Sequence, residues 1–149
     1  YPAADIPQTT VAGVPLRVMM GSAYGLHSPV KVFADTLYVE AQLRAGQRLT
    51  LPDAEERALY VASGQLTANG TVIAEYAMAI FANQPGVVVE AVEDTRLAII
   101  GGEAMTDRYI DWNFVSSRKD RIEQAKADWR EGRFPKVPGD EVEFIPLPG

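Results

Sequence analysis

The side chains that could carry out chemistry are few and scattered in this sequence. His27 is the only histidine, and it lies in a glycine-containing turn between Tyr24 and Pro29. Acid–base catalysis or a triad needs partners within hydrogen-bond reach of the base, and no second histidine is present to supply one. We therefore interpret His27 as a turn or interface residue rather than as a catalytic base.

A second group of reactive side chains is the acidic cluster of Asp53, Glu55 and Glu56, which follows Pro52. Two carboxylates act as general acid and base where an apolar environment separates their pKa values. The cluster lies in a predicted loop without apolar neighbours, so we interpret it as a solvated loop. The chain has no cysteine, which excludes disulfides, thiolate nucleophiles and cysteine-ligated zinc. We therefore assign no catalytic residue.

The overall charge also restricts the possible partners. Lys and Arg number 14 against 20 Asp and Glu, which gives a net charge of −6. This charge opposes nucleic-acid phosphates and anionic lipid headgroups, so we expect no direct nucleic-acid binding and no membrane binding. Since no segment has the roughly 18 consecutive apolar residues of a membrane span, we expect a cytoplasmic protein.

The elements that must position these side chains are short strands. Between Val14 and Gly102, β-rich segments alternate with turn residues, a pattern typical of a sandwich or barrel. Asn69-Gly70 provides the positive φ angles that a two-residue hairpin turn requires. About eight strands would close a small barrel. The strands that we predict cover residues 16–20, 36–43, 57–62, 65–68, 71–74, 77–81, 87–92 and 95–100.

The pattern changes to a helix after Trp112. Residues 117–131 place Ile122, Ala125 and Trp129 on one face, and Gly132 follows as a C-cap. Ser117 and Asp120 resemble a capping box at the start of this helix. We interpret Trp112 and Trp129 as packing residues rather than as a sugar-binding platform.

The two ends of the chain are predicted to be irregular. Residues 1–13 have the composition of an interdomain lead, so we expect this chain to be part of a longer protein. Residues 134–149 contain four prolines and should run extended, with residues 142–145 able to add an edge strand. Between these ends, residues 14–149 are predicted to form one domain.

One long segment resembles a known family. Residues 114–134 read FVSSRKDRIEQAKADWREGRF, which resembles the C-terminal signature of the pirin family. The resemblance implies an all-β, cupin-type (jelly-roll) β-barrel with one C-terminal α-helix and an extended proline-rich tail. It also implies a bicupin parent, whose N-terminal barrel holds an iron-type metal on a histidine cluster and has quercetin 2,3-dioxygenase activity in several members.

The metal-binding pattern of cupins is not matched in this barrel. Placed on Gly46 to Gly64, the two histidine positions of the first cupin motif correspond to Pro52 and Ala54, and its glutamate position corresponds to Arg57. The histidine of the second motif corresponds to Val89. None of these side chains can coordinate a divalent transition ion. A shift by one residue gives Leu51, Asp53, Ala58 and Val88, which offer one carboxylate. We expect no metal and no other cofactor in this chain.

The resemblance places Arg57 where a ligand would face the barrel. An inward arginine could pair with Glu40 or hold an anionic ligand, together with Tyr38 and Tyr60 on the same side. The simpler interpretation is a charge at the rim of the barrel. Which face of each strand points inward depends on register, which the sequence does not fix.

Three functions remain open from the sequence. We favour a metal-free structural partner for the N-terminal cupin of the same parent protein, without enzymatic activity in this chain alone. The first alternative is a binding module for a small organic anion, formed by Tyr38, Glu40, Arg57 and Tyr60. The second is a protein-interaction domain resembling a transcription cofactor, which rests on analogy of fold. We also expect self-association, because separating the two barrels exposes apolar surface.

Overall fold

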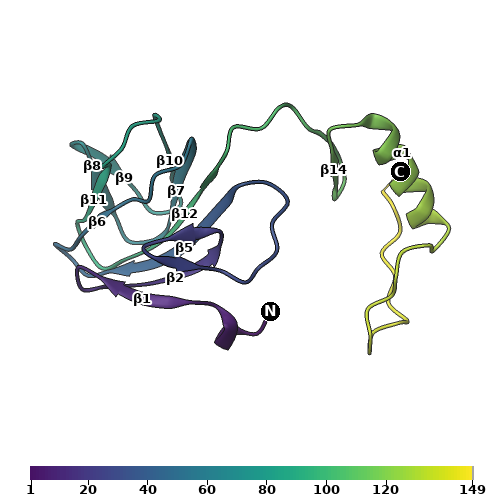
Figure 1. Ribbon diagram of the computed structural model, residues 1–149, viewed down its shortest axis with the longest axis horizontal. Helices are drawn as coiled ribbons and strands as arrows, with labels where there is room; N and C mark the ends of the chain where they lie inside the picture. Colours follow the sequence, from purple (N-terminus) through teal and green to yellow (C-terminus); the bar gives the residue numbers. More distant parts are fainter. Residues whose placement is uncertain (149) are drawn as a thin grey trace. The chain divides into compact units, whose positions relative to one another are not determined.

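The computed structural model describes residues 1–148. Two compact units are present: a barrel unit, Tyr1–Ala104, and a C-terminal unit that begins at Met105. The barrel unit is built mainly of two antiparallel sheets, which Figure 1 shows in purple to teal. The predicted all-β cupin fold with one C-terminal helix is confirmed.

The larger sheet of the barrel unit has six strands in the order β1-β2-β5-β12-β7-β10. Its central strands β5, β12 and β7 are each eight residues long and pair in an antiparallel manner. The bounds are β1 Gln8–Val11, β2 Val14–Met20, β5 Thr36–Leu43, β7 Glu56–Ser63, β10 Met78–Phe81 and β12 Thr95–Gly102.

The smaller sheet has four strands in the order β6-β11-β8-β9. Asn69 and Gly70 have φ angles of 49° and 78°, and Ala68 pairs with Thr71 across them, so the predicted hairpin turn is confirmed. A separate short pair is formed by β3 (Ser22–Ala23) and β4 (Leu26–His27). The bounds of the four strands are β6 Arg48–Thr50, β8 Leu66–Ala68, β9 Thr71–Ile73 and β11 Val88–Ala91.

The core lies between the inner faces of these two sheets. In β5, Leu37, Val39, Ala41 and Leu43 are buried and alternate with more exposed residues, as the sequence predicts. The same alternation in the neighbouring strands builds one continuous cluster. Its fully buried large side chains include Leu49, Leu51, Leu59, Leu66, Leu97 and Ile99. The interior of the barrel is therefore filled with aliphatic side chains.

The N-terminal segment differs from the expectation of an irregular lead. Gln8–Val11 form β1, which pairs with β2 at the edge of the larger sheet. A 3-10 helix, η1, covers Ala3–Asp5. Residues 8–11 contain three polar side chains and a single apolar one, so the sequence offers little alternation from which to predict a strand.

The C-terminal unit contains a hairpin and the predicted helix. The hairpin is β13 (Tyr109–Asp111) with β14 (Phe114–Ser116), and helix α1 covers Lys119–Arg130. Gly132, with a φ of 67°, and Arg133 donate backbone hydrogen bonds to the carbonyls of Trp129 and Asp128. These bonds form a Schellman motif, as the position of the glycine predicts.

Two local predictions for the C-terminal unit are wrong. The N-cap of α1 is Arg118, which makes no side-chain capping bond, so the predicted capping box is absent. Among the described tail residues, 142–145 form no strand, and an isolated bridge joins Val137 to Asp140. No helix within residues 1–148 is both long enough and apolar enough to cross a bilayer.

Candidate functional site

The candidate site consists of the positions that the resemblance aligns with the metal ligands of a cupin. Val89 is fully buried on the inner face of β11, and Pro52 and Ala54 lie half-buried in the loop between β6 and β7. Arg57, at the glutamate position, is buried on the inner face of β7. Within residues 1–148, no three histidine or carboxylate side chains lie close enough together to hold a metal ion. Three carbon side chains and a guanidinium do not fit such an ion.

The guanidinium of Arg57 is bonded to two loops of the barrel. Nη1 donates to the carbonyl oxygen of Pro52 at 2.7 Å and lies 3.3 Å from Oδ1 of Asp53. Nη2 donates to the carbonyl oxygen of Gln84 at 2.9 Å. Pro52 belongs to the loop after β6, and Gln84 belongs to the loop between β10 and β11. Arg57 thus ties both loops to the beginning of strand β7.

The surroundings of Arg57 are largely apolar. Its side chain is 1% exposed, and its Nε is buried with no hydrogen-bond partner. The ring of Phe81 lies 5.9 Å from the guanidinium carbon, within the range of a cation–π contact. Such a group is always protonated, so it cannot act as a general base or as a metal ligand. What it provides is a fixed positive charge at one end of the barrel.

Tyr24 contributes a second polar group at this end. Its hydroxyl donates to the carbonyl oxygen of Thr50 at 2.8 Å. Burial raises the pKa of the Tyr24 hydroxyl well above its ordinary value, and the positive charge of Arg57 partly offsets the increase. Tyr24 therefore stays a neutral donor across the physiological pH range.

The four residues that the sequence groups into one pocket are not brought together. Arg57 points into the barrel with Leu59 and Val61, whereas Tyr60 lies on the opposite face of β7. Tyr38 and Glu40 lie on the outer face of β5, opposite the buried side chains of that strand. The anticipated pair between Arg57 and Glu40 is not formed, because the two side chains are on opposite faces of the larger sheet.

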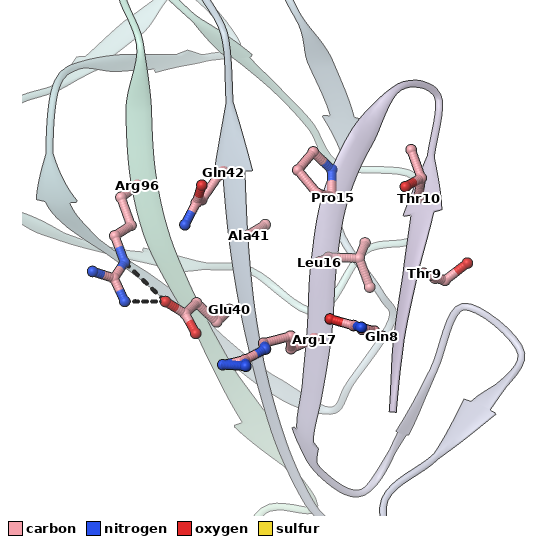
Figure 2. A pocket seen from close by; sticks show the side chains of 10 residues that line it. All are labelled: Gln8, Thr9, Thr10, Pro15, Leu16, Arg17, Glu40, Ala41, Gln42 and Arg96. Atoms are coloured by element: carbon pink, nitrogen blue, oxygen red, sulfur yellow. Dashed lines mark hydrogen bonds and ion pairs between the residues drawn. The ribbon is translucent and has the colours of Figure 1, made fainter. Parts of the chain in front are cut away.

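Glu40 instead lies in a groove of about 550 Å³ on the outer face of the larger sheet, which Figure 2 shows from close by. Its Oε1 accepts hydrogen bonds from Arg96, with a distance of 2.8 Å to Nε. Arg17 is directly opposite Glu40 in the register of β2 and β5. Gln8 and Gln42 line the same groove, so this end of the outer face is polar.

Of the other reactive side chains that the structure describes, only Asp53 contacts Arg57. His27 is exposed, and its Nδ1 lies 2.8 Å from Oγ of Ser22 across the β3–β4 pair. Asp53, Glu55 and Glu56 are all exposed, and Glu55 accepts a hydrogen bond from the backbone amide of Ala104. These placements agree with the interpretation of a turn histidine and a solvated acidic loop.

Within the C-terminal unit, the two tryptophans belong to an aromatic cluster. Trp112 and Trp129 pack edge to face, with ring centroids 5.1 Å apart. The indole nitrogen of Trp129 donates to the carbonyl oxygen of Ile145, and its ring stacks on Phe144. A hollow of about 440 Å³ lies between α1 and the tail beside this cluster. Trp112 thus packs the hairpin against the helix and Trp129 packs the helix against the tail, which agrees with the predicted packing role.

Comparison with known proteins identifies the family of this barrel. The family model described as the pirin C-terminal cupin domain matches residues 38–135, which include strand β7 with Arg57 and helix α1. A pirin-like protein of Caulobacter vibrioides is 43% identical over 146 residues, which cover 97% of this chain. This chain belongs to the pirin family.

Solved structures agree with the barrel fold. A quercetin 2,3-dioxygenase structure from Acinetobacter baumannii superposes on 95% of this chain with a TM-score of 0.76 and 26% identity. A second structure of that description covers 97% of this chain with a TM-score of 0.79 and 22% identity, which supports the fold. This pirin-family chain spans about half the length of these relatives, namely 51% of the Caulobacter protein and 50% of each solved chain.

Proposed function

We propose that this pirin-family barrel is the metal-free, structural half of a two-barrel protein. The observation that carries the proposal is Arg57, which the resemblance aligns with the glutamate of the cupin motif and whose guanidinium is bonded to the carbonyls of Pro52 and Gln84. A permanent cation at this position repels a second cation and offers it no lone pair. Arg57 therefore joins the loops at this end of the barrel and supplies no metal ligand there.

The filled interior supports the same proposal. Leu49, Leu59 and Ile99 are among the fully buried side chains between the two sheets. A binding module needs a cavity lined by some polar groups, and the four polar residues of the predicted pocket do not share one face of the sheet. We therefore prefer a supporting role to the binding of a small organic anion inside the barrel. Any dioxygenase activity of a two-barrel parent would then reside in its other barrel.

Metal analysis of the chain tests this proposal. The protein is dialysed anaerobically against Fe²⁺, Mn²⁺ or Ni²⁺, passed through a desalting column and analysed for elements. We expect well below one ion per chain in every case. Asp53→Asn is the matched control, because Asp53 is the one carboxylate in the register-shifted motif. Retention of one ion per chain would overturn the proposal, and its loss in Asp53→Asn would locate the site at Asp53.

A further inference from the structure

The outer face of the larger sheet carries an apolar patch away from the polar groove. The patch consists of outward-facing residues on five neighbouring strands. Its most exposed members are Ile80, Met78 and Ile100, with exposed fractions of 83%, 54% and 39%. We name this surface the outer patch; it comprises Met20, Tyr38, Ala58, Tyr60, Met78, Ile80, Ala98 and Ile100.

The strand register makes the outer patch continuous. One row across the sheet contains Ile80, Ala58, Ile100, Tyr38 and Met20, which are paired from strand to strand. A second row contains Met78, Tyr60 and Ala98 and then reaches Glu40 and Arg17. The patch itself contains no charged residue, and the groove of Figure 2 begins where the second row becomes charged.

The outer face of the smaller sheet has a different character. Arg48 and Glu90 pair across β6 and β11 at 3.7 Å, with their side chains 67% and 50% exposed. Val72 of β9 also faces outward on this sheet, opposite Thr67 of β8, and its exposed fraction is 55%. A sheet face with paired charges is typical of solvent exposure, whereas an uncharged apolar face with a polar border is typical of an interface.

We infer that the outer patch is the surface on which a second cupin barrel docks, with the polar groove around Glu40 and Arg96 at the edge of that interface. This inference rests on the proposed function. The matched family is described as a C-terminal cupin domain, and the solved chains that superpose on this one are twice its length. A sheet face suits such a partner, because two sheets pack face to face over about 10 Å through interdigitated apolar side chains.

The composition of the outer patch fits a docking surface. Tyrosine and methionine are enriched in interface cores and supply half of its eight residues, namely Tyr38, Tyr60, Met20 and Met78. Ile80 lies on β10, the edge strand of the larger sheet, and its side chain is nearly free in this chain. A charge introduced at this position would leave the barrel core untouched and would face the partner directly.

Binding in trans of the unmatched half of a relative tests the inference. The partner is the half of the Caulobacter vibrioides pirin-like protein that this chain does not match, prepared as a separate polypeptide. Its affinity for the wild-type chain, Ile80→Lys and Val72→Lys is measured by calorimetry and sedimentation velocity. We expect Ile80→Lys to raise the Kd at least about tenfold, because it places an unpaired charge in the interface, and Val72→Lys to leave the Kd unchanged.

The outcomes separate this inference from the proposed function. If the wild-type chain does not bind the other half, the structural-partner proposal fails and the docking surface fails with it. If the wild-type chain and both variants bind equally, the partner proposal stands and the outer patch is the wrong surface. If the chain forms a dimer that Ile80→Lys dissociates and that the partner polypeptide does not compete with, the occupant is a second copy and the inference is overturned.

Discussion

Replacement of Arg57 should lower the free energy of unfolding of the barrel by an amount that can be calculated from its contacts. Arg57→Ala removes the hydrogen bonds to the carbonyls of Pro52 and Gln84, at 2.7 and 2.9 Å. Hydrogen bonds of charged donors contribute about 1.5–3 kcal/mol each, so the two together give about 3 kcal/mol at the low end of that range. The contact with Asp53 adds little, because that carboxylate is 67% exposed.

The cost of burying the Arg57 charge offsets part of the stabilisation that its hydrogen bonds provide. The Nε of Arg57 is buried without a partner, and desolvation of a guanidinium has a cost that its hydrogen bonds must exceed. Arg57→Met keeps most of the volume of the side chain and removes this cost. We therefore expect Arg57→Met to lose about half as much stability as Arg57→Ala, which also leaves a cavity beside Phe81.

Urea unfolding followed by far-UV circular dichroism measures both effects. With a slope of about 2 kcal/mol per molar, a loss of about 3 kcal/mol lowers the midpoint by about 1.5 M. Arg96→Ala is the control, since its side chain is 58% exposed on the outer face and pairs with Glu40. That variant should lose less than about 1 kcal/mol. The reasoning is refuted if Arg57→Ala and Arg96→Ala have the same midpoint.

Further predictions concern other buried or constrained positions. Because burial raises the pKa of Tyr24, folding favours the neutral phenol, and stability should fall as pH rises above about 10, the value in unfolded chains. Tyr24→Phe should flatten this alkaline decrease in Tm; an unchanged slope would contradict the assignment. Gly64→Ala should lower the free energy of unfolding by at least about 2 kcal/mol more than Gly46→Ala, because both glycines have positive φ but only at Gly64 would a Cβ meet backbone atoms, at 2.4 Å. Equal urea midpoints for the two variants would be inconsistent with that contact. Trp129→Phe should accelerate proteolysis of the tail, since it removes the hydrogen bond to Ile145.

Much of the barrel could be predicted from sequence because its strands follow the alternation rule. Residues 36–43 form β5 within the predicted bounds, and the Asn69-Gly70 turn lies where its positive φ angles require. The hairpin of β13 and β14 was not predicted. Its turn contains Trp112 with a φ of 53°, a conformation that tryptophan rarely adopts, so local turn preferences gave no signal.

The site was harder to predict because it depends on strand parity and on distant contacts. Arg57 and Tyr60 are separated by three positions, so in a regular strand they face opposite sides, and this spacing could have excluded the four-residue pocket. The acceptor at Gln84 lies 27 residues from Arg57, and Tyr24 is farther still. No local pattern connects residues so far apart, since their proximity is created by the closure of the barrel.

The two units of this chain carry different chromophores. Both tryptophans, Trp112 and Trp129, lie beyond Met105, whereas every tyrosine except Tyr109 lies in the barrel unit. Indole emission will therefore follow the helix and tail, and a barrel that melts by itself will leave that emission almost unaltered. Phenol absorbance offers the complementary view, so a single sample can show optically whether the two parts unfold together or in sequence.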